Sequence, residues 1–597
     1  MNEHFLIGLA GIVTLGTLAQ WLAWRFRLPS ILLLLIFGFL AGPVTGWLNP
    51  DLLFGELLFP VVSIAVAIIL FEGGMNLKLS EFQKIGGIVW GLVTIGALLT
   101  WLFTTIAAIY LLELPWQIAL LLGSVLVVTG PTVIMPMLRH IQLKGMLGSI
   151  IKWEGITIDP VGAVLAVLVF EALVLGTLEQ IAWLTAFGLL KTLLIGTLLG
   201  FAGAGFLILF FKNYWVPDFL QNAVVLMTVI ATFTLSNLFQ HESGLLTVTL
   251  MGIILVNQKW VSMKHIIEFK ENLQVLLISS LFILLAARVR LEHFQVLGME
   301  SILFLGVLIV IIRPVSTFLA VSRQSSLNWK ERGFLACLAP RGIVAAAVAS
   351  IFAIRLERVG YQQADQLVPL TFLVIMGTVT VYGLTAPWIA RWLQLSDSQP
   401  EGVLFVGAHP MIREIAKCLQ EEQFTVLLID SNWDNISGAR MAGLPAYYGS
   451  ALSEGSSEQL DLSGIGRLVA MTSNSDVNAL ACLHFLEVFG REEIYQLAPF
   501  HPQKTRQGEV PLHLRGRILF GEKIIYHDLI NLFNAGAIIK KTPLTEDFDY
   551  AAFQKFYEIA IPLFMIDKNG HLTIFSADSS PIQDSSVTLI SLVSQTG

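Results

Sequence analysis

The sequence has little charge for its length. Asp, Glu, Lys and Arg make up only 13% of its 597 residues, 55% are hydrophobic, and the mean hydropathy is +0.74. A soluble protein carries roughly a quarter charged residues, so most of this chain belongs in lipid. The chain also lacks the basic stripe that nucleic-acid binding requires, which excludes that class of function.

Cysteine is scarce as well. The three cysteines, Cys337, Cys418 and Cys482, lie far apart in the sequence and offer neither metal-ligand spacing nor a disulfide framework. We interpret them as apolar packing residues. The histidines are scattered, and we interpret none of them as a metal ligand.

The charges that are present divide the chain into two parts. From Leu395 onward the sequence has 14 basic and 24 acidic residues, whereas the part before it has 22 and 19. An apolar, slightly basic part is therefore followed by an acidic, soluble part. The predicted organisation is a transmembrane domain (1–395), a linker (396–401), a Rossmann-like domain (402–535) and a small β-rich α+β subdomain (536–597) with a hairpin turn at 567–570.

Thirteen apolar stretches are long enough to span a bilayer, at about 20 residues each. The first has no basic segment before it and no small-residue cleavage site, so we expect a retained helix and no signal peptide. The ninth and tenth are short. The stretches cover residues 5–24, 30–48, 53–71, 86–112, 117–138, 146–175, 183–211, 219–239, 243–257, 273–287, 299–322, 332–354 and 367–393.

Basic residues gather on one side of these stretches. With the N-terminus outside, fourteen fall in cytoplasmic loops and four in outside loops. The positive-inside rule then predicts a multi-pass protein of a bacterial-type inner membrane, with the N-terminus outside and the acidic part in the cytoplasm. The fourteen are Arg25, Arg27, Lys78, Lys84, Arg139, Lys144, Lys212, Lys259, Lys264, Lys270, Arg323, Lys330, Arg332 and Arg391, and the four are Arg288, Arg290, Arg355 and Arg358.

Two stretches are interrupted by glycine and proline in mid-span. An odd number of spans fits two inverted six-helix repeats around a linker helix, in which the fifth and twelfth spans correspond. The fifth contains Thr129-Gly130-Pro131-Thr132, and the twelfth contains Ala339-Pro340-Arg341-Gly342. Either alone could be an ordinary proline kink, but the matched pair predicts broken helices that cross at a transport site, with Arg341 compensating the half-helix ends.

The sixth stretch contains two acidic residues away from its ends, Glu154 and Asp159, which are costly in a membrane helix and indicate a function. It reads Lys152-Trp153-Glu154-Gly155-Ile156-Thr157-Ile158-Asp159-Pro160. Pro160 cannot donate to the carbonyl of Ile156, which frees polar backbone beside Asp159. Burial favours the protonated form of this carboxyl group and a bound cation favours the ionised form, so Asp159 can hold a proton or a monovalent cation in turn. The alternative is a protonated acid that is hydrogen-bonded within the bundle.

The same stretches contain further polar residues for which we expect roles near Asp159. Glu154 lies about 140° around an ideal helix from Asp159, so we expect it to form a structural ion pair with Arg313 of the eleventh stretch, with direct ligation of the ion as the alternative. Thr129 offers a carbonyl and a hydroxyl oxygen, which a hard cation prefers. Glu72, at the end of the third stretch, is either an interfacial charge in contact with water or a second carboxylate near the ion.

Five phrases in this order, LFEGGMNL, TGPTVI, WEGITIDP, IIRP and APRGIV, resemble the NhaP-like branch of the monovalent cation:proton antiporters, within the Na⁺/H⁺ exchanger family. The resemblance covers residues 5–395. It implies an all-α polytopic homodimer in which a core domain moves like an elevator against a dimerisation domain. It also implies that Asp159 binds the cation, Na⁺, and the proton, that Thr129 and Glu72 lie near the ion, and that Glu154 and Arg313 form a buried pair.

The sequence departs from the family pattern at two positions. The family usually has Thr-Asp in the broken fifth helix, whereas Gly130 follows Thr129 here. It usually has Asn or Asp before the essential Asp, where this chain has Ile158. The ion therefore loses two polar partners, and the pattern leaves the choice among Na⁺, K⁺ and Li⁺ open. Without a second aspartate at 158, we expect electroneutral exchange.

The C-terminal part has βαβ order. Strand 403–406 leads into Gly407 and a helix, and a second strand ends at Asp430, where dinucleotide-binding folds hold a ribose diol. His409 and Ile412 stand where the second and third glycines of the phosphate-binding fingerprint belong. Side chains at these positions obstruct the approach of a pyrophosphate.

Residues 402–535 resemble the TrkA-N/RCK regulatory domain of potassium channels and transporters through the segments 447–450 and 472–478. The candidate nucleotide contacts are Gly407, Asp430 and Gly449. Two interpretations of the domain remain: it binds a regulatory nucleotide, or it is a degenerate dimerisation module. We expect that transport requires no cofactor. We expect no enzyme, because no candidate hydride-transfer base accompanies the fold.

The combined expectation is a secondary transporter that exchanges Na⁺ for H⁺ by alternating access, with K⁺/H⁺ exchange as the alternative that an RCK-like domain favours. A tail-gated ion channel is a rival, but the chain lacks a filter resembling Thr-Val-Gly-Tyr-Gly. A membrane sensor that transports nothing is the third possibility, which inactive but ion-stabilised protein would support.

Overall fold

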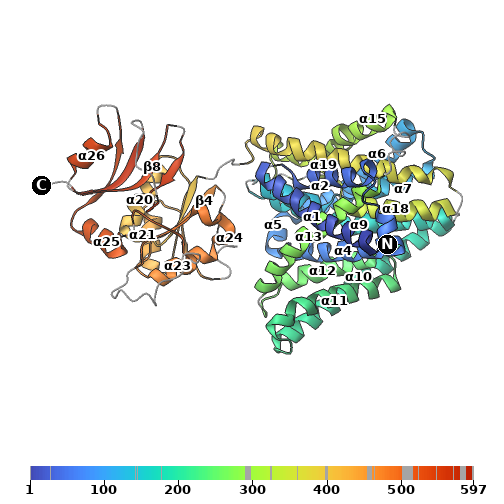
Figure 1. Cartoon of the computed structure of the whole chain (residues 1–597), viewed down its shortest axis with the longest axis horizontal. Helices are drawn as coiled ribbons and strands as arrows, with labels where there is room; N and C mark the ends of the chain where they lie inside the picture. Colours follow the sequence, from blue (N-terminus) through green and yellow to red (C-terminus); the bar gives the residue numbers. More distant parts are fainter. Residues whose placement is uncertain are drawn as a thin grey trace. The chain divides into compact units, whose positions relative to one another are not determined.

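The structure, a computed structural model, divides into two compact units, residues 1–396 and 397–597. Figure 1 shows the first as a bundle of helices, coloured blue to yellow, and the second as strands and helices, coloured orange to red. Within the predicted linker, residues 397–400 lie outside the described residues. The structure describes residues 2–26, 28–141, 143, 145–175, 178–261, 263–289, 298–322, 324, 326–358, 361–396, 401–453, 460, 462, 464–499, 515–521, 523–545, 548–557, 559–568, 570–578 and 587–594.

The first unit is built from helices, because backbone groups in lipid must be hydrogen-bonded within the segment itself. Three π-helical turns (η1, η3 and η4) and two 3₁₀ turns (η2 and η5) lie between or within them. The elements are α1 Asn2–Phe26, α2 Ser30–Phe39, η1 Leu40–Val44, α3 Pro50–Phe54, η2 Gly55–Leu57, α4 Leu58–Met75, α5 Leu79–Gly91, η3 Leu92–Gly96, α6 Ala97–Leu112, α7 Trp116–Val125, α8 Pro131–Ile141, α9 Leu147–Leu175, α10 Leu178–Lys212, α11 Asp218–Phe239, α12 Ser243–Asn257, α13 Lys264–Arg288, α15 Met299–Val307, η4 Leu308–Ile312, α16 Arg313–Ala320, α17 Trp329–Ala336, α18 Ile343–Arg358, η5 Gln362–Gln366 and α19 Leu367–Trp392.

These helices occupy the thirteen predicted stretches. Among the described residues, eight helices are long and apolar enough to cross a membrane, and four shorter apolar helices accompany them, so the first unit is a multi-pass membrane domain. The fifth stretch consists of α7 and α8, and the twelfth of α17 and α18, with irregular backbone at 126–130 and 337–342 between the halves. The predicted pair of broken helices is confirmed.

The prediction that Lys270 lies in a loop is wrong. Helix α13 begins at Lys264, before the apolar stretch itself, and Lys270 lies two turns inside it. The side chain is buried and donates a hydrogen bond to Asn76 Oδ1 at 3.4 Å. Lys270 is therefore a buried helical residue and not a loop residue. Four other residues of the positive-inside argument, Arg27, Lys144, Arg290 and Arg323, lie outside the described residues.

Helices α4 and α12 pack backbone against backbone. A Cβ atom added at Gly74 of α4 would lie 2.3 Å from the carbonyl oxygen of Thr249, and one added at Gly252 of α12 would lie 2.2 Å from the carbonyl oxygen of Phe71. Both distances are shorter than van der Waals contact, so only glycine fits. Close approach through small residues is a common way for helices to associate in lipid. The contact fixes the end of α4 that contains Glu72.

The second unit contains two sheets. A parallel six-stranded sheet has the order β3-β2-β1-β4-β5-β6, and an antiparallel four-stranded sheet has the order β7-β10-β8-β9. The strands are β1 Gly402–Val406, β2 Val426–Asp430, β3 Ala446–Tyr448, β4 Ile465–Ala470, β5 Ile494–Gln496, β6 Arg517–Ile518, β7 Ile538–Pro543, β8 Ile559–Ile566, β9 Leu572–Ile574 and β10 Thr588–Ser594. The helices are α20 Pro410–Glu421, α21 Trp433–Met441, α23 Ser475–His484, α24 Leu486–Phe489, α25 Tyr526–Asn534 and α26 Tyr550–Phe556, with the 3₁₀ turn η6 Arg491–Glu493.

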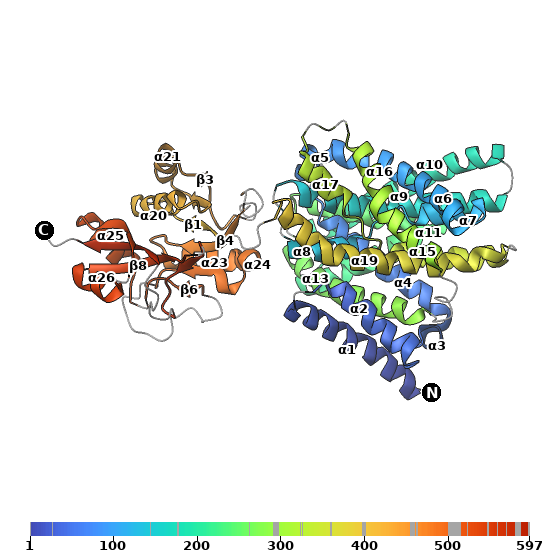
Figure 2. The ribbon, with the colours of Figure 1, turned by 90° about the horizontal axis from the view of Figure 1, so that it is seen from above.

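The two sheets share one apolar core. Strand β1 is central and buried at every position, as is usual in a parallel sheet that is covered on both faces. Phe405 of β1 and Phe564 of β8 lie in the same cluster, with ring centroids 6.3 Å apart. Figure 2 shows α25 and α26 beside the small sheet. The six-stranded and four-stranded sheets therefore form one body within the second unit.

The predicted hairpin turn joins β8 to β9. Gly570 N donates to the carbonyl oxygen of Asp567 at 3.1 Å, and Gly570 has a φ of +80°, which favours glycine. Asn569 of the turn lies outside the described residues.

Gly252→Ala should destabilise the membrane unit, because its methyl group would push α12 away from α4. We expect a loss of about 1–3 kcal/mol, the usual cost of overpacking, measured as a lower melting temperature of the detergent-purified protein. Gly205→Ala is the matched control, since Gly205 lies within α10 and a Cβ atom there meets nothing within 4 Å. An equal fall in the two variants would contradict the backbone contact.

Candidate ion-binding site

The two broken helices cross at a pair of glycines. Gly130 N donates to the carbonyl oxygen of Pro340 at 3.0 Å, which links the two irregular segments. A Cβ atom added at Gly130 would lie 2.3 Å from Gly342 Cα, and one added at Gly342 would lie 2.4 Å from Gly130 Cα. The backbones touch, so a side chain has no room at either position. This contact accounts for glycine where the family usually has aspartate. Pro131, next in the chain, begins α8.

Each broken helix leaves carbonyl groups without partners, and a buried arginine binds them. Arg341, between α17 and α18, donates through Nη1 to the carbonyl oxygens of Val127 and Val128 at 3.0 and 3.2 Å. Arg313, the first residue of α16, donates through Nη2 to the carbonyl oxygens of Leu335 and Leu338 at 3.2 and 3.0 Å. A cation is favourable at the C-terminal end of a helix, most of all where no water can replace it.

Arg313 also pairs with Glu154. Its Nη1 and Nη2 atoms lie 2.7 and 3.0 Å from the two carboxylate oxygens, and both side chains are buried. The structure thus brings together the two residues that the sequence analysis paired. The second contact of Arg313, with the end of α17, was not foreseen. The sequence could have indicated this contact, because two broken helices leave two half-helix ends at membrane depth and each end requires a cation.

Asp159 lies on a face of α9 that two glycines flank. Gly155, Asp159 and Gly162 are spaced i, i+4 and i+7, which places them on one side of a helix. A Cβ atom at Gly155 would lie 2.6 Å from Ile134 Cδ1 of α8, and one at Gly162 would lie 2.3 Å from Val128 Cγ2 of the irregular segment. The glycine face of α9 therefore packs against the break in the fifth span, and Asp159 faces that break.

Polar groups at the break lack partners. Neither carboxylate oxygen of Asp159 has a hydrogen-bond partner among the described residues, and the same is true of the hydroxyl groups of Thr129 and Thr132. All three side chains are buried, with Asp159 1% exposed. A bare carboxylate in an apolar interior is unstable unless a proton or a cation compensates it. The sequence analysis missed Thr132, although it lies one turn from Thr129.

Glu72 lies near the same part of α9. Its neighbour Gly73 would place a Cβ atom 3.5 Å from Ile156 Cγ1. The Glu72 side chain is 2% exposed, so it is not the water-exposed interfacial charge that was one of its two interpretations.

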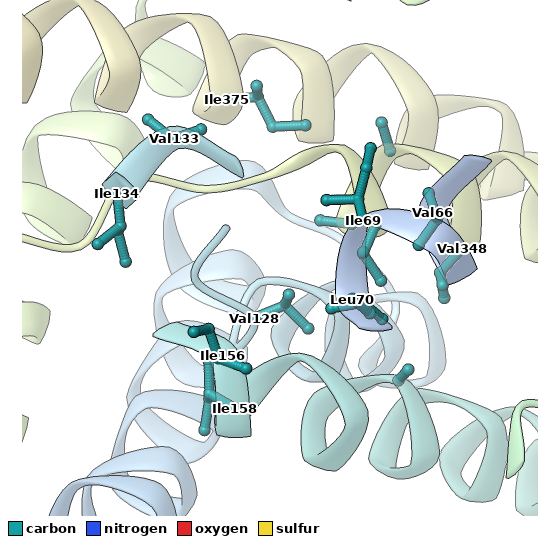
Figure 3. Packing of buried hydrophobic residues seen from close by; sticks show 14 of the residues in the cluster. Val66, Ile69, Leu70, Val128, Val133, Ile134, Ile156, Ile158, Val348 and Ile375 are labelled. Carbon is teal, nitrogen blue, oxygen red and sulfur yellow. The ribbon is translucent and has the colours of Figure 1, made fainter. Parts of the chain in front are cut away.

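Apolar side chains enclose the site. Figure 3 shows part of a buried cluster to which Ile156 and Ile158 of α9 belong, together with residues of α4, α8, α18 and α19 and of the irregular segment. Ile158 is 3% exposed and belongs to this packing, and its hydrocarbon side chain offers the ion no oxygen. The other labelled members of the cluster are Val66, Ile69 and Leu70 of α4, Val128 of the irregular segment, Val133 and Ile134 of α8, Val348 of α18 and Ile375 of α19.

The three candidate nucleotide contacts lie at the carboxyl ends of adjacent strands in the second unit. Gly407 follows β1, Asp430 ends β2 and Gly449 follows β3. The parallel register of the three strands places the three residues at one edge of the sheet. All three have hydrogen bonds within the chain: Gly407 N donates to the Ile429 carbonyl oxygen and Gly449 N to that of Asp430.

Comparison with known proteins shows the family of the chain. The family model described as "sodium/hydrogen exchanger, transmembrane" matches residues 11–392, which is more than half of the chain. The chain belongs to the sodium/hydrogen exchanger family. A TrkA-N domain model matches residues 403–499 of the chain. The family is one of transporters and not of enzymes.

Named relatives of the chain differ in the cation that their names give. It is 26% identical over 399 residues to the K(+)/H(+) antiporter NhaP of Alkalimonas amylolytica, covering 65% of this chain and 66% of that protein. It is also 26% identical over 359 residues to Na(+)/H(+) antiporter 1 of Methanocaldococcus jannaschii, covering 58% of this chain and 83% of that protein. The match thus spans just under two thirds of the first relative's length.

A solved structure has the same fold. The sodium proton antiporter MjNhaP1 of Methanocaldococcus jannaschii, determined at pH 8, superposes with a TM-score of 0.55 at 21% identity. The match covers 65% of this chain and 99% of that chain. The first unit of the chain therefore has the fold of that antiporter.

Glu154→Gln should strongly destabilise the protein, because it leaves the Arg313 guanidinium buried without a counter-charge. Breaking one side of a buried ion pair typically costs about 3–5 kcal/mol, which a melting curve of the purified protein would measure. Glu81→Gln is the matched control: Glu81 pairs with Lys152 at 2.9 Å, but both side chains are partly exposed. A melting temperature of Glu154→Gln no lower than that of the control would contradict a structural role for the pair.

Proposed function

We propose that the exchanger transports a monovalent cation in exchange for a proton, and that Asp159 holds each of them in turn. The observation that carries the proposal is a buried carboxylate that faces the crossing of two broken helices and has no hydrogen-bond partner among the described residues. Three other buried charges nearby, Glu154, Arg313 and Arg341, are satisfied by one another or by carbonyl groups. Asp159 is therefore the group whose charge an ion from outside must compensate.

Proton and cation exclude each other at such a site. In an apolar surrounding, a bound cation stabilises the ionised carboxylate, whereas an empty site favours the protonated acid. Thr129 and Thr132 supply oxygen atoms that are free to replace water around the cation, as a hard cation requires. The carbonyl oxygens of Val127 and Val128 already accept from Arg341, so they are less available to the ion.

One titrating carboxylate supports electroneutral exchange. The Glu154–Arg313 pair has no net charge, and Ile158 contributes none at the position before Asp159. Each passage of Asp159 thus carries one positive charge, whether proton or cation. Alternating access by an elevator-like movement in a homodimer, with the N-terminus outside an inner membrane and the TrkA-N domain as a cytoplasmic regulator, completes the proposal.

Na⁺ is the proposed cation and K⁺ the second candidate. The named relatives support both, since one is called a K(+)/H(+) antiporter and another a Na(+)/H(+) antiporter. Two features of this site, Gly130 and Ile158, remove polar partners, and a smaller set of oxygens suits a cation that holds its water less firmly. This is the specific reason to test K⁺ beside Na⁺.

Asp159→Asn should abolish exchange and leave folding intact, because the amide can hold neither a proton nor a cation charge. The test uses proteoliposomes with an acidic interior and a trapped pH-sensitive dye, to which Na⁺, Li⁺ or K⁺ is added. Asp51→Asn is the control, since Asp51 is an exposed carboxylate whose partner is Arg288. We expect cation-driven alkalinisation in the wild type and in the control only. Exchange that survives in Asp159→Asn would refute the site.

The rate of exchange should not respond to an imposed membrane potential, because one positive charge crosses in each direction. The same liposomes measure this with the preferred cation, at a potential set by an ion that the exchanger does not carry. A rate that changes steeply with the potential would instead require a second charge to move. A larger response to K⁺ than to Na⁺ would establish the second candidate function.

A further inference from the structure

We infer that the crevice at the carboxyl ends of β1, β2 and β3 is closed by the chain itself and takes no dinucleotide. In a fold of this kind the pyrophosphate rests on a glycine-rich turn and the N-terminus of the following helix, and an acid at the end of the second strand binds the ribose. The closure is made by His409 of that turn and by Tyr526 of α25, a helix that packs with the small sheet. The inference stands independently of the proposed transport function.

The turn after β1 has few N–H groups left for a phosphate. Gly407 has a φ of +114°, as the glycine of such a turn should, but its N–H donates to the carbonyl oxygen of Ile429 at 2.8 Å. The next N–H, of Ala408, donates to Asp430 Oδ2 at 2.9 Å. Helix α20 then begins with Pro410, which has no N–H.

Asp430 is occupied by the chain. Its Oδ2 accepts from Ala408 N and from Asn435 Nδ2, at 2.9 and 2.8 Å, and its Oδ1 accepts from Asn432 N at 2.8 Å. A carboxylate has about four acceptor positions, so these three bonds leave too little for a ribose diol. Gly449 N, the third predicted contact, donates at 3.0 Å to the backbone carbonyl of the same Asp430.

Side chains fill the space above the turn. Ile412 is fully buried, and its Cδ1 atom lies 3.2 Å from where a Cβ atom of Gly407 would be. The His409 ring packs edge to face with Tyr526, with centroids 6.2 Å apart and planes at 77°. His409 Nδ1 is buried and has no hydrogen-bond partner among the described residues, so the ring is held by packing.

The charges around His409 agree with a packed, neutral ring. Burial lowers the pKa of the imidazole from its ordinary value near 6.5, and nearby Arg413 lowers it further, while Asp430 partly opposes them. Burial also raises the pKa of the Tyr526 hydroxyl, and Asp430 adds to this, so the phenol is neutral as well. Two neutral rings then form the contact between the phosphate turn and α25. A pyrophosphate would have to separate them.

The first arm of the test is a binding titration. Full-length protein in detergent is titrated with NAD⁺, NADH and ATP by calorimetry, alongside Asp430→Ala. We expect no saturable binding of any of the three up to about 1 mM, far weaker than a dedicated site would give. Saturable binding in the wild type that Asp430→Ala removes would overturn the inference.

The second arm tests the contact itself. His409→Ala and Tyr526→Ala should each increase hydrogen exchange in α25, Tyr526–Asn534, because each removes half of the ring contact. Tyr550→Ala is the matched control, since Tyr550 stacks on Phe553 within α26. Exchange in α25 that is unchanged in both variants, or raised equally in the control, would overturn the closure by His409 and Tyr526.

Discussion

The structure of the membrane unit depends on one constraint: a backbone carbonyl at membrane depth needs a hydrogen-bond donor, and water is absent. A helix that is broken within the membrane violates this constraint at the end of each half-helix. The protein meets it with two buried guanidinium groups, Arg341 at the fifth span and Arg313 at the twelfth. Each arginine then raises a second problem, a buried positive charge. Glu154 solves it for Arg313, and carbonyl dipoles alone solve it for Arg341 among the described contacts.

Close backbone packing then fixes the position of the site. Gly130 and Gly342 hold the two irregular segments in contact, and the glycines on either side of Asp159 hold α9 against the first of them. Each of these contacts would be lost with the addition of a single methyl group. The position of Asp159 therefore depends on the absence of side chains at these glycines. This packing brings the Asp159 carboxylate to the break, although neither carboxylate oxygen forms a hydrogen bond with a described residue.

The sequence predicted the parts of this arrangement that carry a charge or break a helix. Charge at membrane depth is rare, so Asp159 and the partners Glu154 and Arg313 could be recognised without a structure. The crossing was predicted because the two Gly-Pro segments lie at corresponding positions of the two inverted repeats. What could not be predicted was the tertiary approach of backbones. Gly130 seemed only to lack an aspartate, whereas the structure gives it a steric role. Thr132 looked like part of an ordinary helix start.

The carboxylates of Asp430 and Asp159 have opposite hydrogen-bonding environments, and this difference bears on function. Asp430 stands where a ligand is expected from the fold, yet three donors of the chain already bind its oxygens. Asp159 lies in an apolar interior, where an uncompensated charge is costly, yet no described residue forms a hydrogen bond with its carboxylate. Because an unsatisfied carboxylate is expensive in an apolar interior, a protein retains one only where an ion supplies the missing partner. By this reasoning the hydrogen bonds of a site indicate its ligand better than the fold does. They favour an ion at the break in the fifth span and a self-contained contact at the strand ends of the second unit.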